Sequence, residues 1–254
     1  MAKARAGEWW EGYFDDQYLL EYEPIFSPGR DRRDAARIID VLELPSASRI
    51  LDVPCGQGRH AHLLAEAGFD VTGLDYSRTL LARAMARGTG SRLRYLRGDM
   101  RALPAPWTAR FDAVLNLFTS FGFFGHPGDD ARVIHEFARV LKPGGVLLWH
   151  GGSRDGVVRS FISRDWWSTA DGTMIGHERS FDPLSGVLTV RTTVKGARKT
   201  VEREHRIRLY TATRIAELCA DAGLIVEQAW DGWSDEPLTR KSGEMLILAR
   251  KGDG

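Results

Sequence analysis

The sequence predicts an α/β protein, in which a parallel sheet is covered by helices on both faces and is followed by an antiparallel β insertion. Three observations lead to this prediction. Between residues 49 and 151, short apolar strands alternate with helical segments. One of these strands, Phe111–Leu117, is almost wholly apolar, as expected when both faces are buried. From residue 173 to 210, β-branched runs alternate with turn residues, which is typical of an antiparallel meander.

The composition bounds the class of protein. With 254 residues, the chain can form one large domain or a domain with a subdomain, and its net charge of +1 gives no general attraction to nucleic acid or to an acidic membrane. Cys55 and Cys219 lie far apart in the sequence, which argues against a disulfide framework. Residues 1–5 precede no apolar stretch, and no run approaches the ~20 apolar residues of a membrane span. We therefore expect a cytoplasmic protein without a signal peptide or membrane segment.

The N-terminal segment is expected to be helical. Aromatic residues recur at helical spacing from Trp9 to Tyr22, and a second helix is predicted over Arg30–Leu44, where Pro45 stops it. The aromatic stripe predicts either packing against the sheet or a lid over the active site.

The elements of the predicted sheet follow in order, and helices separate its strands. The expected strands are Arg49–Val53, Asp70–Leu74, Leu93–Leu96, Phe111–Leu117, Val146–Trp149, Leu224–Trp230 and Glu244–Ala249. The expected helices are Arg59–Ala67, Ser77 to about Arg87, about Asp130 to Leu141, which Lys142–Gly145 ends, and Thr211–Ala222. The segment Arg159–Trp167 is ambiguous from its sequence alone.

The most informative stretch is Ile50–His60, a strand that ends at Asp52 and continues through Gly56 and Gly58 into a helix. The glycines let the backbone approach a ligand closely, and the first turn of the helix presents free N–H groups. The carboxylate of Asp52 beside this turn would repel a pyrophosphate and attract a ligand that carries an ammonium group.

Acids also follow the next two strands, at Asp75 and Asp99. Because the carboxyl ends of neighbouring parallel strands share one crevice, the three acids should converge there. Asp75 lies 19 residues after Gly56, close to the roughly 20 residues typical of an acid that binds ribose hydroxyls. Asp99 is a candidate acceptor for the adenine amine. Together, the three acids predict a nucleoside with a positively charged tail, which describes S-adenosylmethionine.

The chain strongly resembles the class I S-adenosylmethionine-dependent methyltransferases. The resemblance covers about half of the chain and implies a Rossmann-like seven-stranded sheet of order 3-2-1-4-5-7-6, with the last strand antiparallel. It rests on five motifs in order, namely Leu51–Arg59, Val71–Ser77, Arg97–Pro104, Phe111–Val114 and Val140–Gly145.

The same resemblance implies the cofactor site. Gly56 and Gly58 would lie against the methionine moiety with Asp52 nearby, and Asp75 would hold the ribose. Tyr76 would flank the adenine, whose amine and ring would meet Asp99 and the backbone N–H of Met100. The residues predicted to bind the cofactor are Tyr13, Tyr22, Asp52, Pro54, Cys55, Gly56, Gly58, Arg59, Asp75, Tyr76, Ser77, Asp99, Met100, Arg101, Asn116, Leu117 and Phe118.

The chain is similar, more closely, to small-molecule methyltransferases that carry an aromatic N-terminal segment and an antiparallel insertion after the fifth strand, such as sugar-amine N-methyltransferases. This similarity implies a lid at residues 1–44, with Tyr13 and Tyr22 on the cofactor, and a main domain formed by residues 45–152 and 208–252. Residues 153–207 would cover the acceptor, form a homodimer interface, or both. In that group a serine-containing turn follows the fourth strand, where this chain has Phe118–Gly122. Phe123 and Phe124 follow this turn, which disfavours a polar sugar as the acceptor. The side chains that are expected either to line an apolar acceptor pocket or to lie in the core are Phe118, Phe121, Phe123, Phe124, Trp166 and Trp167.

Methyl transfer from a sulfonium requires mainly that the acceptor be positioned and water excluded. A hydroxyl acceptor usually needs a base, for which His126 is the first candidate and His150 the second, although each could be an exposed or core histidine. The lack of a convincing base favours N-methylation over O-methylation. We expect a small-molecule acceptor and no nucleic acid, membrane or metal, since His60 and His62 diverge at the helix start.

Four alternatives were weighed. A nicotinamide-binding oxidoreductase fits the relaxed fingerprint Gly56-x-Gly58-x-x-Ala61, but Asp52 disfavours its pyrophosphate. A hydrolase lacks the glycine required two residues before Ser120. An RNA or protein methyltransferase would use the locally basic residues 191–208, but a solvated hairpin face explains these charges better. The fourth alternative is a scaffold that binds the cofactor without transferring a methyl group.

Overall fold

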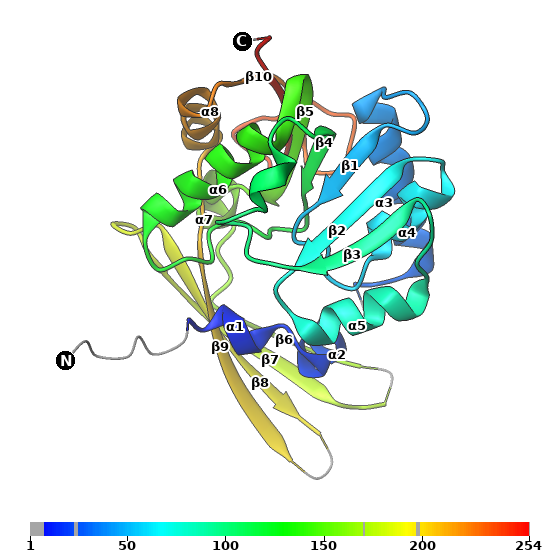
Figure 1. The fold of residues 1–254 in the computed structure, drawn as a ribbon. Coiled ribbons are helices and arrows are strands. Elements are labelled where there is room, and N and C mark those ends of the chain that lie inside the picture. The colour runs from blue at the N-terminus through cyan, green and yellow to red at the C-terminus, as the bar shows by residue number, and fades with distance from the viewer. Residues whose placement is uncertain (1–7, 23–24, 170, 197–198, 254) are drawn as a thin grey trace, which may run out of the picture.

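The computed structural model describes residues 8–22, 25–169, 171–196 and 199–253. The predictions for residues 1–5, and the first part of the predicted lid, lie outside these ranges. Figure 1 shows a twisted sheet between two layers of helices, with an antiparallel insertion extending away from it. Among the described residues, no helix has the length and apolar character needed to cross a membrane.

The main sheet has the predicted topology. Its order is β10-β11-β5-β4-β1-β2-β3, which is 3-2-1-4-5-7-6 when the strands of this sheet are counted alone. β11 runs antiparallel to both of its neighbours, and the pairs among β1 to β5 are parallel. The strands are β1 Arg49–Asp52, β2 Asp70–Asp75, β3 Leu93–Arg97, β4 Phe111–Asn116, β5 Leu141–Gly152, β10 Leu224–Asp231 and β11 Glu244–Lys251.

Two apolar clusters lie on opposite faces of this sheet. Val114 of β4 belongs to the cluster that includes side chains of α6 and α8, whereas the adjacent Leu115 belongs to the cluster of α3, α4 and α5. Successive side chains of a strand point to opposite faces, so β4 is buried on both, as its apolar sequence predicts. The helices are α3 Pro28–Leu42, α4 Arg59–Glu66, α5 Arg78–Arg87, α6 Pro127–Val140 and α8 Ala212–Asp221, with a short 3-10 helix at Ala105–Trp107.

Several element boundaries differ from the prediction, among them those at the two ends of α6. α6 begins at Pro127 rather than near Asp130, because Nδ1 of His126 accepts a hydrogen bond from the backbone N–H of Gly128 at 3.0 Å and caps the helix. Lys142–Gly145 does not separate a helix from a strand. β5 already begins at Leu141, and its pairing with β4 jumps from Leu141 to Val146, so these four residues form an irregularity within β5.

The predicted meander is confirmed as β7 Met174–Asp182, β8 Val187–Lys195 and β9 Thr200–Arg208, which pair antiparallel. The ambiguous segment resolves into the end of α7, Arg154–Arg159, and a further strand, β6 Arg164–Ser168, which pairs with β7. α1 Trp10–Tyr13 and α2 Asp16–Tyr22 lie beside this insertion (Figure 1).

Candidate active site

The carboxyl ends of β1, β2 and β3 open into one cavity, and Asp52, Asp75 and Asp99 all line it. The convergence of the three acids follows from the parallel strand order, in which β1 lies between β4 and β2. Other predicted cofactor residues on this first cavity are Pro54, Cys55, Gly56, Arg59, Tyr76, Ser77, Met100, Leu117 and Phe118.

The turn between β1 and α4 requires glycine at two positions. Gly56 and Gly58 have φ angles of 55° and 74°, in the left-handed region that favours glycine. A Cβ atom on Gly58 would also collide with the Tyr95 hydroxyl, whereas one on Gly56 would meet no atom of the described residues within 4 Å. Gly58 therefore lets α4 pack closely on β3, and Gly56 leaves room at the cavity wall for a ligand.

Backbone N–H groups fix the Asp75 carboxylate. The Gly56 N–H donates to Oδ2 at 2.8 Å, and the Ser77 N–H donates to Oδ1 at 2.8 Å. Burial raises the pKa of Asp75 to about 6, although these N–H groups oppose the rise. Each carboxylate oxygen of Asp75 has a second lone pair that can accept a further hydrogen bond. The Asp75 side chain at the end of β2 is therefore positioned to accept hydrogen bonds from two neighbouring hydroxyls of a ligand.

The charge of the buried Asp52 carboxylate is only partly compensated. Asp52 is 2% exposed, and its Oδ2 has no hydrogen-bond partner among the described residues. Burial raises the pKa of Asp52 to about 7; the Arg59 guanidinium opposes this rise and the Asp75 carboxylate adds to it. A buried carboxylate without a partner is unfavourable. A positively charged group in the cavity would compensate it, so the donor set fits a ligand with an ammonium group.

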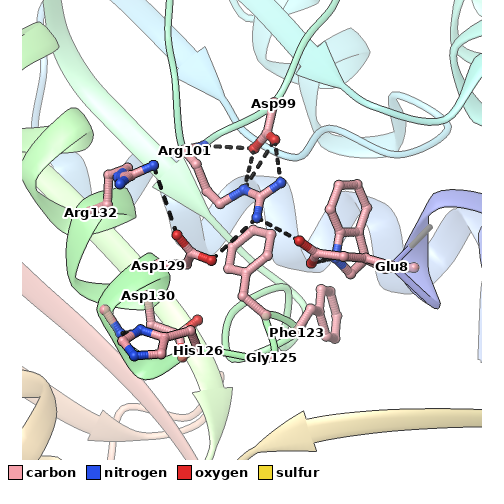
Figure 2. Close-up of polar contacts among 12 residues, drawn as sticks. Glu8, Asp99, Arg101, Phe123, Gly125, His126, Asp129, Asp130 and Arg132 are labelled. Atoms are coloured by element: carbon pink, nitrogen blue, oxygen red, sulfur yellow. Dashed lines mark hydrogen bonds and ion pairs between the residues drawn. The ribbon is translucent and has the colours of Figure 1, made fainter. Parts of the chain in front are cut away.

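The third acid, Asp99, is held by Arg101. Nε and Nη2 of Arg101 donate to Asp99 Oδ2 at 3.0 and 2.8 Å, and Nη1 reaches Glu8 at 2.9 Å and Asp129 at 3.4 Å. Figure 2 shows this guanidinium surrounded by the three carboxylates. Arg101 does not line the first cavity formed by the described residues. It orients Asp99 and connects the N-terminal segment to the end of β3 and to α6.

Several predicted residues lie elsewhere. Gly58 packs behind the turn, and Asn116 is fully buried, with its Nδ2 donating to the Val53 carbonyl at 2.8 Å. His126 is exposed at the start of α6 (Figure 2) and lines neither of the two cavities described here. Its Nδ1 caps that helix and the residue lies outside both cavities, so the structure does not support His126 as the general base.

A second cavity of about 360 Å³ adjoins the first. It lies among the N-terminal helices, the inner face of the insertion, and residues that follow β4 and β5. Tyr13 and Tyr22 line this second cavity rather than the first, in which Trp10, Phe14 and Tyr18 stand instead. The family resemblance predicted that both tyrosines contact the cofactor, whereas in the structure both line the second cavity. The two cavities share Phe14, Tyr18, Phe118, Ser120 and Phe123.

The predicted acceptor aromatics divide between the cavities and the rest of the molecule. Phe118 and Phe123 line the second cavity, and Phe124 lines the first. Phe121 is buried in the core on β4's α6 side. On β6, Trp166 is 70% exposed. The ring of Trp167 packs against the ring of His177, but Trp167 does not itself line the second cavity.

Three histidines line the second cavity. His150, on β5, is 1% exposed, and its Nε2 lies 3.3 Å from Glu244 Oε2, whereas its Nδ1 has no partner among the described residues. Burial lowers the pKa of His177 and His205 to about 4, so both are neutral at pH 7. His205 Nδ1 lies 2.9 Å from the Tyr13 hydroxyl.

Sequence reasoning named only His150 of these polar residues. His177 and His205 alternate with outward-facing residues on β7 and β9, so strand periodicity could have placed them on the inner face of the meander. Glu244 begins β11 and reaches His150 only through the antiparallel pairing of that strand with β5. In the part of the chain that the structure describes, no group of three His, Cys, Asp or Glu side chains could hold a metal ion.

Residues 50–145 match a family model described as a methyltransferase domain. The dTDP-3-amino-3,4,6-trideoxy-alpha-D-glucopyranose N,N-dimethyltransferase of Streptomyces venezuelae is 30% identical over 226 residues, which cover 84% of this chain and 93% of that protein. The glycine/sarcosine N-methyltransferase of Halorhodospira halochloris is 35% identical over 188 residues, or 72% of this chain and 70% of that protein. A solved methyltransferase of Streptomyces caelestis superposes with a TM-score of 0.82 at 18% identity, covering 95% of this chain and 99% of the other.

Proposed function

The chain belongs to the class I S-adenosylmethionine-dependent methyltransferases, and we propose that it N-methylates a small molecule bound in the second cavity. The observation that carries the proposal is the junction of the two cavities, which share four aromatic rings from Phe14, Tyr18, Phe118 and Phe123. Because the chain belongs to this family, we set aside the alternatives of a nicotinamide-binding oxidoreductase and a hydrolase.

In this proposal, the first cavity holds the cofactor. Asp75 accepts hydrogen bonds from the ribose hydroxyls, Asp52 faces the ammonium group, and Asp99 receives the adenine amine. The open wall at Gly56 lies against the methionine moiety. When bound, S-adenosylmethionine supplies an electrophilic methyl group on a sulfonium. The unpaired buried oxygen of Asp52 supports this assignment, because a cationic group in the first cavity would compensate it.

The aromatic junction orients the acceptor and excludes water. The four rings surround the boundary between the cavities, so the methyl group would pass between apolar side chains. The faces of aromatic rings also attract a positive charge such as that of the sulfonium. Residues 1–44 act here as a lid on the main domain of residues 45–152 and 208–252. The insertion, residues 153–207, covers the acceptor.

The polar groups of the second cavity favour an amine acceptor in its neutral form. Arg30 and Arg179 line this cavity with one carboxylate, Glu244. Arg179 is paired with Asp165 at 2.9 Å and Glu244 with His150 at 3.3 Å, so the described lining offers an ammonium no unpaired carboxylate. The bond between His150 Nε2–H and Glu244 leaves Nδ1 as a proton acceptor, so we assign His150 to take the proton that the amine loses. Two relatives whose printed names are N-methyltransferases support N over O transfer.

The proposal is tested with a panel of small amines, each paired with the alcohol of the same shape. S-adenosylhomocysteine formation and the methylated product are followed by mass spectrometry. Turnover of amines above their paired alcohols is expected. Methylation of alcohols alone, or of RNA or protein alone, would contradict the proposal.

The role of His150 is tested with the best acceptor from that panel. His150→Gln should lower kcat by about a hundred-fold or more, the range for loss of a general base, and leave the affinity for S-adenosylhomocysteine unchanged. His135→Gln, an exposed change on α6, is the matched control. Equal kcat in both variants would remove His150 from the reaction.

A further inference from the structure

Four arginines surround a small pocket at the edge of the main sheet opposite to the first cavity. Arg49 begins β1, Arg92 and Arg94 lie at the start of β3, and Arg110 directly precedes β4. β1 to β4 are parallel, so their amino ends lie together on the side away from the acids Asp52, Asp75 and Asp99. The Asp70 and Ser91 side chains complete the polar wall, and the cavity has a volume of about 140 Å³.

The positive charge of this pocket is not compensated within the described part of the chain. None of the four guanidinium groups takes part in an ion pair found among residues 8–22, 25–169, 171–196 and 199–253. Nε of Arg94 donates to the Thr72 hydroxyl at 3.0 Å, and Arg92 donates to the Gly68 carbonyl, both neutral groups. The nearby Asp112 carboxylate binds Lys142 at 2.6 Å instead.

Arg110 stands out within the group. Its Nε is buried and has no hydrogen-bond partner among the described residues. Burial and the positive charges of Arg94 and Arg49 hold the pKa of the Arg110 guanidinium below its ordinary value. Other arginines of the chain, such as Arg139 on α6, have a carboxylate partner, in that case Glu136 at 2.7 Å. Like charges held together around one opening are unfavourable unless an anion lies between them.

We propose that this arginine pocket, formed by Arg49, Arg92, Arg94 and Arg110, binds a phosphoryl anion. Guanidinium groups bind phosphate oxygens through paired N–H donors, which suits them to this ligand better than to a monovalent ion. Four guanidinium groups against the one carboxylate of Asp70 favour a multiply charged anion, and the volume fits a phosphate or diphosphate group. The site is separate from the methyl-transfer cavities and does not depend on the acceptor.

The test uses inorganic pyrophosphate and the full chain, with ionic strength held constant by sodium chloride. Calorimetry should show saturable binding, and the melting temperature should rise by about 2–4 °C at saturation, the shift expected from about 1 kcal/mol of linkage in a chain of this size. Arg94→Gln and Arg110→Gln should each weaken pyrophosphate binding at least about ten-fold. Arg206→Gln, an exposed arginine paired with Glu204 on the insertion, is the matched control.

Binding of S-adenosylhomocysteine at wild-type affinity verifies that each variant is folded. A pyrophosphate effect that is absent in the wild type, or unchanged in both pocket variants, overturns the proposal. A second readout needs no ligand. The side chain of Arg49 makes no hydrogen bond among the described residues, so relief of repulsion predicts that Arg49→Gln unfolds at an equal or higher denaturant concentration than the wild type. A lower midpoint would contradict the uncompensated charge on which the proposal rests.

Discussion

Asp52→Asn separates the contributions of this residue to stability and to binding. The Asp52 side chain is 2% exposed, and burial raises its pKa from 3.8 to about 7. A raised pKa means that the folded state holds the proton more tightly than the unfolded state. This group therefore supports the fold below about pH 4, and that support is lost as the pH rises through 7. At ~1.36 kcal/mol per pKa unit, the ionised carboxylate costs the unliganded fold about 4 kcal/mol above pH 7.

The variant no longer titrates, so its stability relative to the wild type should increase between pH 4 and 8 by up to about 4 kcal/mol. Denaturant unfolding of the unliganded protein at each pH measures this difference. An effect of the asparagine amide on stability that is the same at every pH does not change the dependence of this difference on pH. Glu136→Gln is a control of opposite sign, because Arg139 lowers the pKa of Glu136 and the lost stability should appear at neutral pH and vanish in acid.

Binding should change in the other direction. Loss of a charge-assisted contact to the ammonium group should weaken S-adenosylhomocysteine binding about ten- to hundred-fold at pH 8. Wild-type affinity should fall as the pH drops below 7, where Asp52 takes up a proton. A stability difference that is constant from pH 4 to 8, or unchanged affinity in the variant, would refute the reasoning.

Two further predictions concern residues that support the first cavity from behind its walls. Arg101→Gln leaves three carboxylates without their shared cation, and calorimetry should show S-adenosylhomocysteine binding about ten-fold weaker. The control Arg83→Gln removes an exposed surface pair and should leave this affinity unchanged. Equal losses of affinity in both variants would contradict the role of Arg101. Gly58→Ala combines a φ of 74° with a collision against the Tyr95 hydroxyl, so the free energy of unfolding should fall by about 1–3 kcal/mol. An unchanged denaturation midpoint would show that the turn tolerates a side chain.

The main sheet could be predicted from the sequence because each strand carries its own signal. The apolar run at Phe111–Leu117 and the acids Asp52, Asp75 and Asp99 mark local features, and parallel topology converts their positions into one crevice. Position along the strands was therefore sufficient to find the first cavity. Arg101 was included among its residues, but its pairing with Glu8 and Asp129 depends on how the N-terminal segment and α6 pack.

The second cavity could not be predicted in the same way. Its walls come from the inner face of the insertion, from the N-terminal helices and from β11, which meet only through tertiary packing. The family resemblance predicted Tyr13 and Tyr22 at the cofactor, but it carries no information on the break between α1, which ends at Tyr13, and α2, which begins at Asp16. Both tyrosines line the second cavity. The contact of Glu244 with His150 likewise depends on the register between β11 and β5.

The central claim is that the three acids at the strand ends hold S-adenosylmethionine. Calorimetric titration of S-adenosylhomocysteine into the wild type and into Asp75→Ala tests it most directly, because Asp75 is fixed by two backbone N–H groups and lines the first cavity. We expect one binding site per chain and at least about a hundred-fold loss of affinity in the variant, which loses charged hydrogen bonds to two hydroxyls. No binding to the wild type, or equal binding to both proteins, would contradict the account.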